Sequence, residues 1–253
     1  MTDPRPEAWR PCAAYLYVLH LNGPALAWEY LRRHPDYRRD WRRRRGRTGT
    51  IAQRWGLHGL ENPGLDAREA HPAWRSESAH LVQIHPDLAP TADAVLFDVW
   101  RIAGHKHLFH EGQHMVLTAW LPGRWRSFAL APALEYGMAC VHVGRNGDAE
   151  LPPVADEASW SCSRPRPSRA MLLEAHTLQA LDAMLAGATL REVAEALHGT
   201  AVVASDWHAD SALRARVRRL AQRGAVLMRG GYRRLLRHAP VGQGRLHDPT
   251  KRP

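Results

Sequence analysis

The chain between Ser211 and Arg237 is rich in arginine, the side chain best suited to binding phosphate. This stretch contains nine arginines and no aspartate or glutamate. A guanidinium group presents its N–H donors as a planar fork that matches a phosphate or a guanine edge. A cationic run without balancing carboxylates favours a polyanionic partner, and the common polyanion is nucleic acid. The bland alternative is a structural bundle on which the arginines form only a solvated face.

We expect the arginines of this stretch to contact DNA in two ways. Those nearest the bases would be Arg214, Arg216 and Arg218. Those holding backbone phosphates would be Arg219, Arg223, Arg233 and Arg234. A second basic block contains Arg42, Arg43, Arg44 and Arg45. It fits a secondary phosphate clamp or minor-groove arm, and equally a basic helix end, since cations favour helix C-termini.

His110, Glu111 and His114 have the spacing HExxH, which indicates a different chemistry, that of a zinc site. On a helix, two such histidines share a face and bind zinc while the glutamate activates water. Here the flanking residues alternate as strands do, and Gly112 interrupts the motif. We therefore expect a hairpin at this point and keep a zinc hydrolase only as a remote alternative. The sequence has no Gly-rich phosphate loop or nucleophile elbow, so we expect neither an enzyme nor a cofactor.

A helix is needed to present the arginines, and the sequence predicts one over about 210–228. Its apolar stripe recurs at steps of four and three: Leu213, Val217, Leu220, Gly224 and Leu227. Upstream, Thr189 and Glu192 have capping-box spacing. They predict a short helix from Thr189 to His198 that ends at Gly199.

A short capped helix followed by a basic helix is typical of a helix-turn-helix. The connector Thr200–Ala209 is longer than such a turn, and we expect it to be an extended cover. Further helices are expected at Ala170–Leu185 and Tyr232–Leu236. An alternative makes Val226–Leu236 a hairpin wing that turns at Gly230-Gly231, which is also a DNA-binding arrangement.

The rest of the chain predicts a helical region and then a small sheet, so the fold class is α+β. Helices are expected at 23–33, 35–45 and 51–55; strands are expected at 94–100, 107–109, 114–120, 125–130 and 138–143. The predicted domains are 1–75, a helical regulator-like region; 76–150, a small antiparallel β region; 151–168, a Pro-rich linker; 169–239, an all-α helix-turn-helix domain; and 240–253, a disordered tail.

Composition agrees with a nucleic-acid partner and a reducing compartment. The 253 residues carry a formal net charge of +10. Three widely spaced cysteines form no CxxC pair, which argues against a metal cluster and for a reducing environment. The sequence contains no signal-like or membrane-spanning run. We expect a cytoplasmic protein that binds double-stranded DNA, with RNA polymerase or another regulator as a further partner.

Several strings of the sequence resemble a known pair of domains. The C-terminal strings are Leu178–Asp182, Gly187–Ala194, Leu213–Leu220 and Gly230–Leu236. They resemble a proteobacterial family of helix-turn-helix domains found on integrative and conjugative elements. The N-terminal strings are Ala27–Arg38, Trp55–Leu57 and Glu61–Pro63. They resemble the transcriptional-regulator-like domain that often precedes that family, an architecture similar to activators of symbiosis-island excision in rhizobia.

The resemblance implies a transcriptional activator of genes for excision or conjugative transfer of a mobile element. The same C-terminal domain also occurs alone in an anti-activator that works by binding protein. The alternative is therefore a protein-interaction regulator whose arginines capture an acidic surface, without direct DNA contact.

Overall fold

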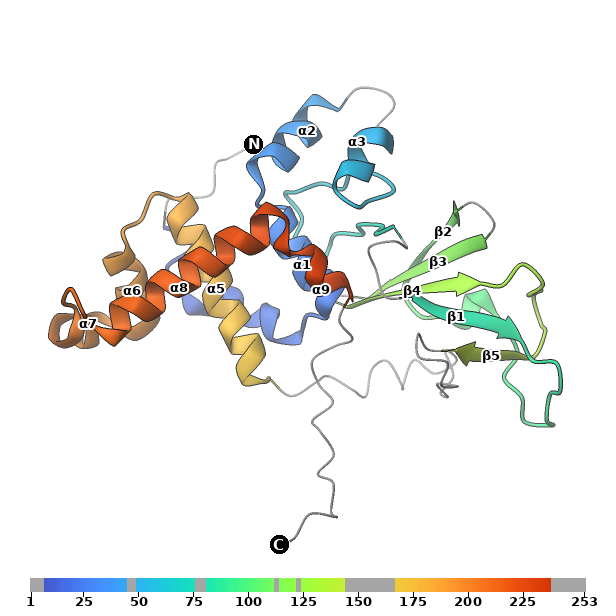
Figure 1. Cartoon of the computed structure of the whole chain (residues 1–253). Coiled ribbons are helices and arrows are strands. Elements are labelled where there is room, and N and C mark those ends of the chain that lie inside the picture. The colour runs from blue at the N-terminus through green and yellow to red at the C-terminus, as the bar shows by residue number, and fades with distance from the viewer. Residues whose placement is uncertain are drawn as a thin grey trace, which may run out of the picture.

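The computed structural model places helices at one end of the molecule and a sheet at the other (Figure 1). It describes residues 7–44, 49–75, 81–111, 114–121, 124–143 and 167–237. The predicted fold class is confirmed: N-terminal and C-terminal helices are separated in the sequence by the segment that forms a mostly antiparallel five-stranded sheet. Residues 151–166 of the predicted linker and the predicted tail lie outside the described residues.

The N-terminal part contains a 3₁₀ helix, Cys12–His20, and the helices α1 (Gly23–Leu31), α2 (Pro35–Arg43) and α3 (Gly49–Arg54). Helix α1 begins where the Asn22 side chain accepts a hydrogen bond from the amide of Ala25, with proline in the first turn. The three α-helices were predicted from the sequence, whereas the 3₁₀ helix was not.

The sheet has the strand order β2-β3-β4-β1-β5. Its strands are β1 (Leu81–Pro86), β2 (His105–Glu111), β3 (His114–Leu121), β4 (Arg124–Leu130) and β5 (Cys140–Val143). Strands β1 and β4 are parallel, and the other neighbours are antiparallel. Trp120 and Trp125 pack into the helical core, and the indole of Trp120 donates to the carbonyl of Pro72 at 3.2 Å.

One predicted strand is wrong and one real strand was missed. Residues 94–100 contribute only an isolated bridge between Leu96 and Ala139. Asp98 ends this segment because its carboxylate accepts from the amide of Trp100 and caps a 3₁₀ turn over Val99–Arg101. Strand β1 lies between β4 and β5 instead, a position set by pairing with distant segments.

The C-terminal helices are α5 (Arg169–Leu185), α6 (Leu190–His198), α7 (Thr200–Asp206), α8 (Ala212–Val226) and α9 (Arg233–Arg237). The expected extended cover over Thr200–Ala209 is wrong, because Gly199 takes a φ of 87° and α7 starts at once. The hairpin-wing alternative is also wrong. A kinked turn over Leu227–Gly231 links α8 to α9, and the helix is broken there at Gly230, which has a φ of 135°.

The N-terminal and C-terminal helices share one hydrophobic core, although the whole sheet lies between them in the sequence. Trp28 and Tyr30 of α1 lie in it together with Leu178 of α5 and Tyr232, all of them fully buried or nearly so. Arg33 links the same helices by donating to both oxygens of Asp182 at 2.6 and 2.8 Å. The position of the C-terminal helices is therefore fixed by the N-terminal region. Within the described residues no helix is long and apolar enough to cross a membrane.

Candidate nucleic-acid interface

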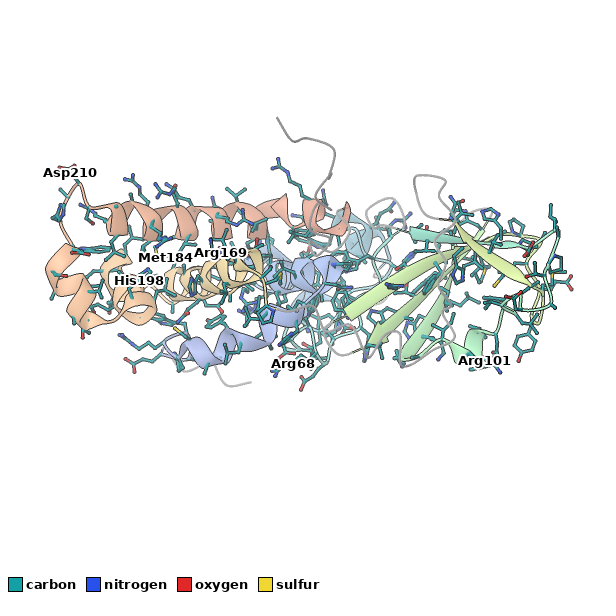
Figure 2. All side chains as sticks on the ribbon, turned by 90° about the horizontal axis from the view of Figure 1, so that it is seen from below. Arg68, Arg101, Arg169, Met184, His198 and Asp210 are labelled. Atoms are coloured by element: carbon teal, nitrogen blue, oxygen red, sulfur yellow. The ribbon has the colours of Figure 1, made fainter. Side chains whose placement is uncertain are left out.

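Helix α8 carries most of the arginines that the sequence predicts to bind DNA. Ser211 caps it by accepting a hydrogen bond from the amide of Arg214 at 3.0 Å. Val217, Leu220 and Gly224 are buried, as the apolar stripe predicted. The 15 residues of α8 make a rod about 22 Å long. Its exposed side chains project outward along one long side of the molecule (Figure 2).

Gly224 lets α8 lie close against α5. A Cβ atom added to it would come within 2.9 Å of the Cβ of Leu181 and 3.1 Å of the carbonyl oxygen of Thr177. This close contact sets how far the outer face of α8 stands from the rest of the molecule.

The seven predicted DNA-contacting arginines are all exposed. Five of them lie on α8 and two on α9. Arg214 and Arg218 flank one side of the buried stripe, whereas Arg216, Arg219 and Arg223 flank the other. The structure thus places these residues on α8 and, beyond the bend at Gly230, on α9; their contact with DNA stays a prediction.

Arg223 differs from the others because its guanidinium pairs with the buried carboxylate of Glu174 on α5. The same carboxylate accepts a hydrogen bond from the Tyr30 hydroxyl at 2.6 Å. Arg223 therefore fastens α8 to α5 and α1, and a phosphate would have to compete with Glu174 for it. No local sequence signal identifies this partner, which lies 49 positions away.

Arg216 lies near two imidazoles. Burial and the positive charge of Arg216 lower the pKa of both His176 and His198. The imidazoles are therefore held neutral at a pH where exposed histidines begin to protonate.

The arginines of α9 lie where the chain turns back onto the N-terminal region. Arg233 donates to the backbone carbonyl of Arg54 at 2.6 Å, and the hydroxyl of Tyr232 donates to the carbonyl of Trp55 at 3.0 Å. Arg234 is exposed on the same short helix.

Helices α6 and α7 form a compact helix pair, because a single residue, Gly199, separates them. The α6 cap has the predicted capping box: Thr189 accepts from the Glu192 amide, and the Glu192 carboxylate accepts from the Thr189 amide. Helix α7 itself (TAVVASD) contains no basic residue. The cationic surface of this region therefore lies on α8.

The second basic block lies on a separate element. Arg42 and Arg43 form the last turn of α2, and Arg44 follows as its C-cap. The guanidinium of Arg44 lies 3.4 Å from the centre of the Trp41 ring. Arg45 lies outside the described residues.

The HExxH residues lie on a hairpin. His110 and Glu111 end β2 and His114 begins β3, with Glu111 opposite His114. The Glu111 carboxylate lies 2.5 Å from Nε2 of His58, so its neighbour is a histidine of the N-terminal region. In the part of the chain that the structure describes, no three histidine, cysteine or acidic side chains are grouped to hold a metal ion.

Several carboxylates of the helical half are engaged in contacts away from α8 and so do not balance its exposed arginines. Glu29 pairs with Arg32 and Arg33. Asp182 also accepts from Tyr15 at 2.8 Å, and Glu195 pairs with Arg191 at 3.1 Å. The sequence-level excess of arginine therefore becomes a surface feature of α8 and α9.

Comparisons with protein families give three matches along the chain. Residues 8–58 match a proteobacterial transcriptional regulator-like domain. Residues 79–126 match a domain of unknown function. Residues 150–237 match a family described as T6SS, transcription factor, DNA binding domain. No curated protein matches the chain.

The matches at residues 8–58 and 150–237 support a DNA-binding transcriptional regulator. They coincide with the two helical regions that share a core, and the DNA-binding match includes α8 and α9. The matched families are regulatory and DNA-binding, so they point away from an enzyme. DNA is accordingly the partner that the comparison supports.

Proposed function

We propose that the protein activates transcription by binding duplex DNA through the outer face of α8 and the start of α9. The observation that carries the proposal is the exposed, acid-free row of arginines on α8, within the region that matches a DNA-binding family. Arg214, Arg216 and Arg218 would lie nearest the bases. Arg219, Arg233 and Arg234 would hold phosphates, with Arg223 released from Glu174 or contributing partly.

We also propose that the regulated genes serve excision or conjugative transfer of a mobile element. The resemblance of both helical regions to regulators on such elements supports this choice. Mapping the bound sites across the source genome tests it. Sites confined to promoters of other processes, such as secretion, would contradict the target while leaving DNA binding intact.

DNA binding itself is tested by fluorescence anisotropy with duplex from upstream of neighbouring genes, over a salt series with nonspecific competitor. If about six phosphates are neutralised, log affinity falls with log salt at a slope near −5. The double variant Arg218→Gln, Arg219→Gln should weaken binding and make the slope less steep by about one, because Arg219 is the phosphate contact of the pair.

Arg101→Gln is the matched control, because Arg101 ends the 3₁₀ turn Val99–Arg101 at the far end of the molecule from Asp210 (Figure 2). It should leave affinity and slope unchanged. Wild-type binding that ignores salt, or a double variant that matches the wild type, would refute the proposed interface. If the wild type binds no DNA but captures an acidic protein, the anti-activator alternative is correct.

A further inference from the structure

A polar pocket of about 380 Å³ lies where the end of the C-terminal helical segment meets the N-terminal region. Three guanidinium groups and an imidazole line it, from Arg54, Arg229, Arg233 and His34. Trp55 and Tyr232 also line it and are almost completely buried. The volume falls within the usual range of small-ligand sites, about 300–1,000 Å³.

The positive charges are only partly balanced within the protein. Arg229 is exposed and makes no hydrogen bond or ion pair with the described residues. The nearest carboxylate to Arg54 is Asp40, at 3.7 Å, and Asp40 accepts from the indole of Trp55 at 2.9 Å. Asp36 also lines the pocket, but it pairs with Arg39 of its own helix at 2.8 Å.

The imidazole of His34 is prepared to donate a hydrogen bond. Its Nδ1 accepts from the amide of Asp36 at 3.1 Å, so the neutral ring carries its proton on Nε2. Burial lowers the pKa of His34, and the charges of Arg54 and Arg229 lower it further against the opposing charges of Asp36 and Asp40. An anion in the pocket would counter the two arginines and so raise the pKa of His34.

The kinked turn Leu227–Gly231 builds this arrangement from two parts of the chain. It carries Arg229, and the hydroxyl of Tyr232 that follows it holds the turn against Trp55. Here the turn aligns arginines of the DNA-binding match with Arg54 of the regulator-like match.

We propose that this pocket binds a phosphate group. Guanidinium groups that line one pocket together with a neutral imidazole donor match a phosphate dianion in charge and in the kind of hydrogen-bond donor it needs. The phosphate would come either from a small phosphorylated molecule or from a DNA backbone that also follows α8. A phosphate from either source would bridge α3 and the kinked turn Leu227–Gly231. The proposal does not require that α8 binds DNA.

Thermal unfolding of the full chain with inorganic pyrophosphate, at constant ionic strength, tests the free source. Pyrophosphate should raise the Tm of the wild type in a saturable way. Arg229→Gln and Arg54→Gln should lose that rise, whereas Arg218→Gln, on α8 outside the pocket, should keep it. In NMR titrations, pyrophosphate should raise the pKa of His34. Circular dichroism of Arg229→Gln checks that the variant folds, and Arg54→Gln gives an independent reading.

The DNA source is tested by the salt dependence of DNA affinity in the same variants. If a backbone phosphate occupies the pocket, Arg229→Gln and Arg54→Gln should each reduce the salt slope by about one, without a specific pyrophosphate response. Either pattern supports the phosphate site and names its source. An equal pyrophosphate response in all variants, or no effect in either assay, would overturn it. Failure of the α8 interface would appear separately, as an unchanged slope in Arg218→Gln, Arg219→Gln.

Discussion

The carboxylate of Glu29 is a buried charge that helps to join the N-terminal and C-terminal helices. Glu29 is 0% exposed and lies 2.7 Å from Arg32 and 2.5 Å from Arg33. Its other oxygen accepts from the amide of Ala67 at 2.7 Å. Glu29→Gln keeps the shape but removes the charge, leaving both guanidinium groups without their shared counterion. Because Arg33 also binds Asp182 of α5, the loss of stability should extend to the core that the N-terminal and C-terminal helices share.

The pKa of Glu29 gives the magnitude. Burial acts to raise this pKa, but Arg32 and Arg33 outweigh it and hold the pKa at about 2, below the ordinary 4.5. At about 1.4 kcal/mol for each pKa unit, the folded state favours the ionised form by about 3 kcal/mol. Breaking a buried ion pair costs about 3–5 kcal/mol. We therefore expect Glu29→Gln to lower the free energy of unfolding at pH 7 by about 3 kcal/mol.

The sign of the pH dependence follows from the lowered folded-state pKa. The stabilisation is present above the unfolded-state pKa of about 4.5 and is lost as the pH falls towards 2. Glu29→Gln should lack this part of the acid dependence.

Urea unfolding followed by tryptophan fluorescence, at pH 7 and through the acid range, measures both effects. Glu195→Gln is the control, because Glu195 pairs with Arg191 on the surface and should contribute under about 0.5 kcal/mol. A Glu29→Gln loss below about 1 kcal/mol, or one equal to that of Glu195→Gln, would refute the reasoning.

Two further predictions concern the spacing of helices and the histidines of the sheet. Gly224→Ala should destabilise the protein by about 1–3 kcal/mol, because the added Cβ overlaps Leu181. The better helix propensity of alanine offsets about 1 kcal/mol of that cost. Gly49→Ala, where the added Cβ meets open space, should not destabilise the protein. A Tm for Gly224→Ala at or above that of the wild type would contradict this. Burial and the charge of His105 lower the pKa of His107. The stability that neutral His107 contributes to the folded protein is therefore present above about pH 6.5 and is lost as the pH falls below that value. His107→Gln should therefore lose less stability than the wild type between pH 6.5 and 5 in urea unfolding; identical pH profiles would count against it.

The sequence predicted the helices well, because their signals are local. The four-and-three stripe ending at Leu227 located α8, and the capping box at Thr189 located the start of α6. Proline at the first turn located α1 and α2. Each signal acts within one or two turns of the chain, so it can be read without knowing what the helix packs against.

The strands were predicted less well because their partners are distant. Residues 94–100 are apolar enough for a strand, yet they form only one bridge, while Leu81–Pro86 gains partners on both sides. Pairing with segments far along the chain decided between the two.

For the candidate site, the sequence by itself determined the charge: an acid-free run of arginines on one amphipathic helix, and hence a polyanion-binding surface. Only the tertiary structure decided which arginines have buried partners. Arg223 meets Glu174, while Arg54 and Arg229 face one pocket although the whole sheet separates them in the sequence. The physical reason is the distance along the sequence over which each interaction acts. Caps and periodicity are set by neighbours within a few residues, whereas ion pairs and pockets arise when a shared core brings distant segments together.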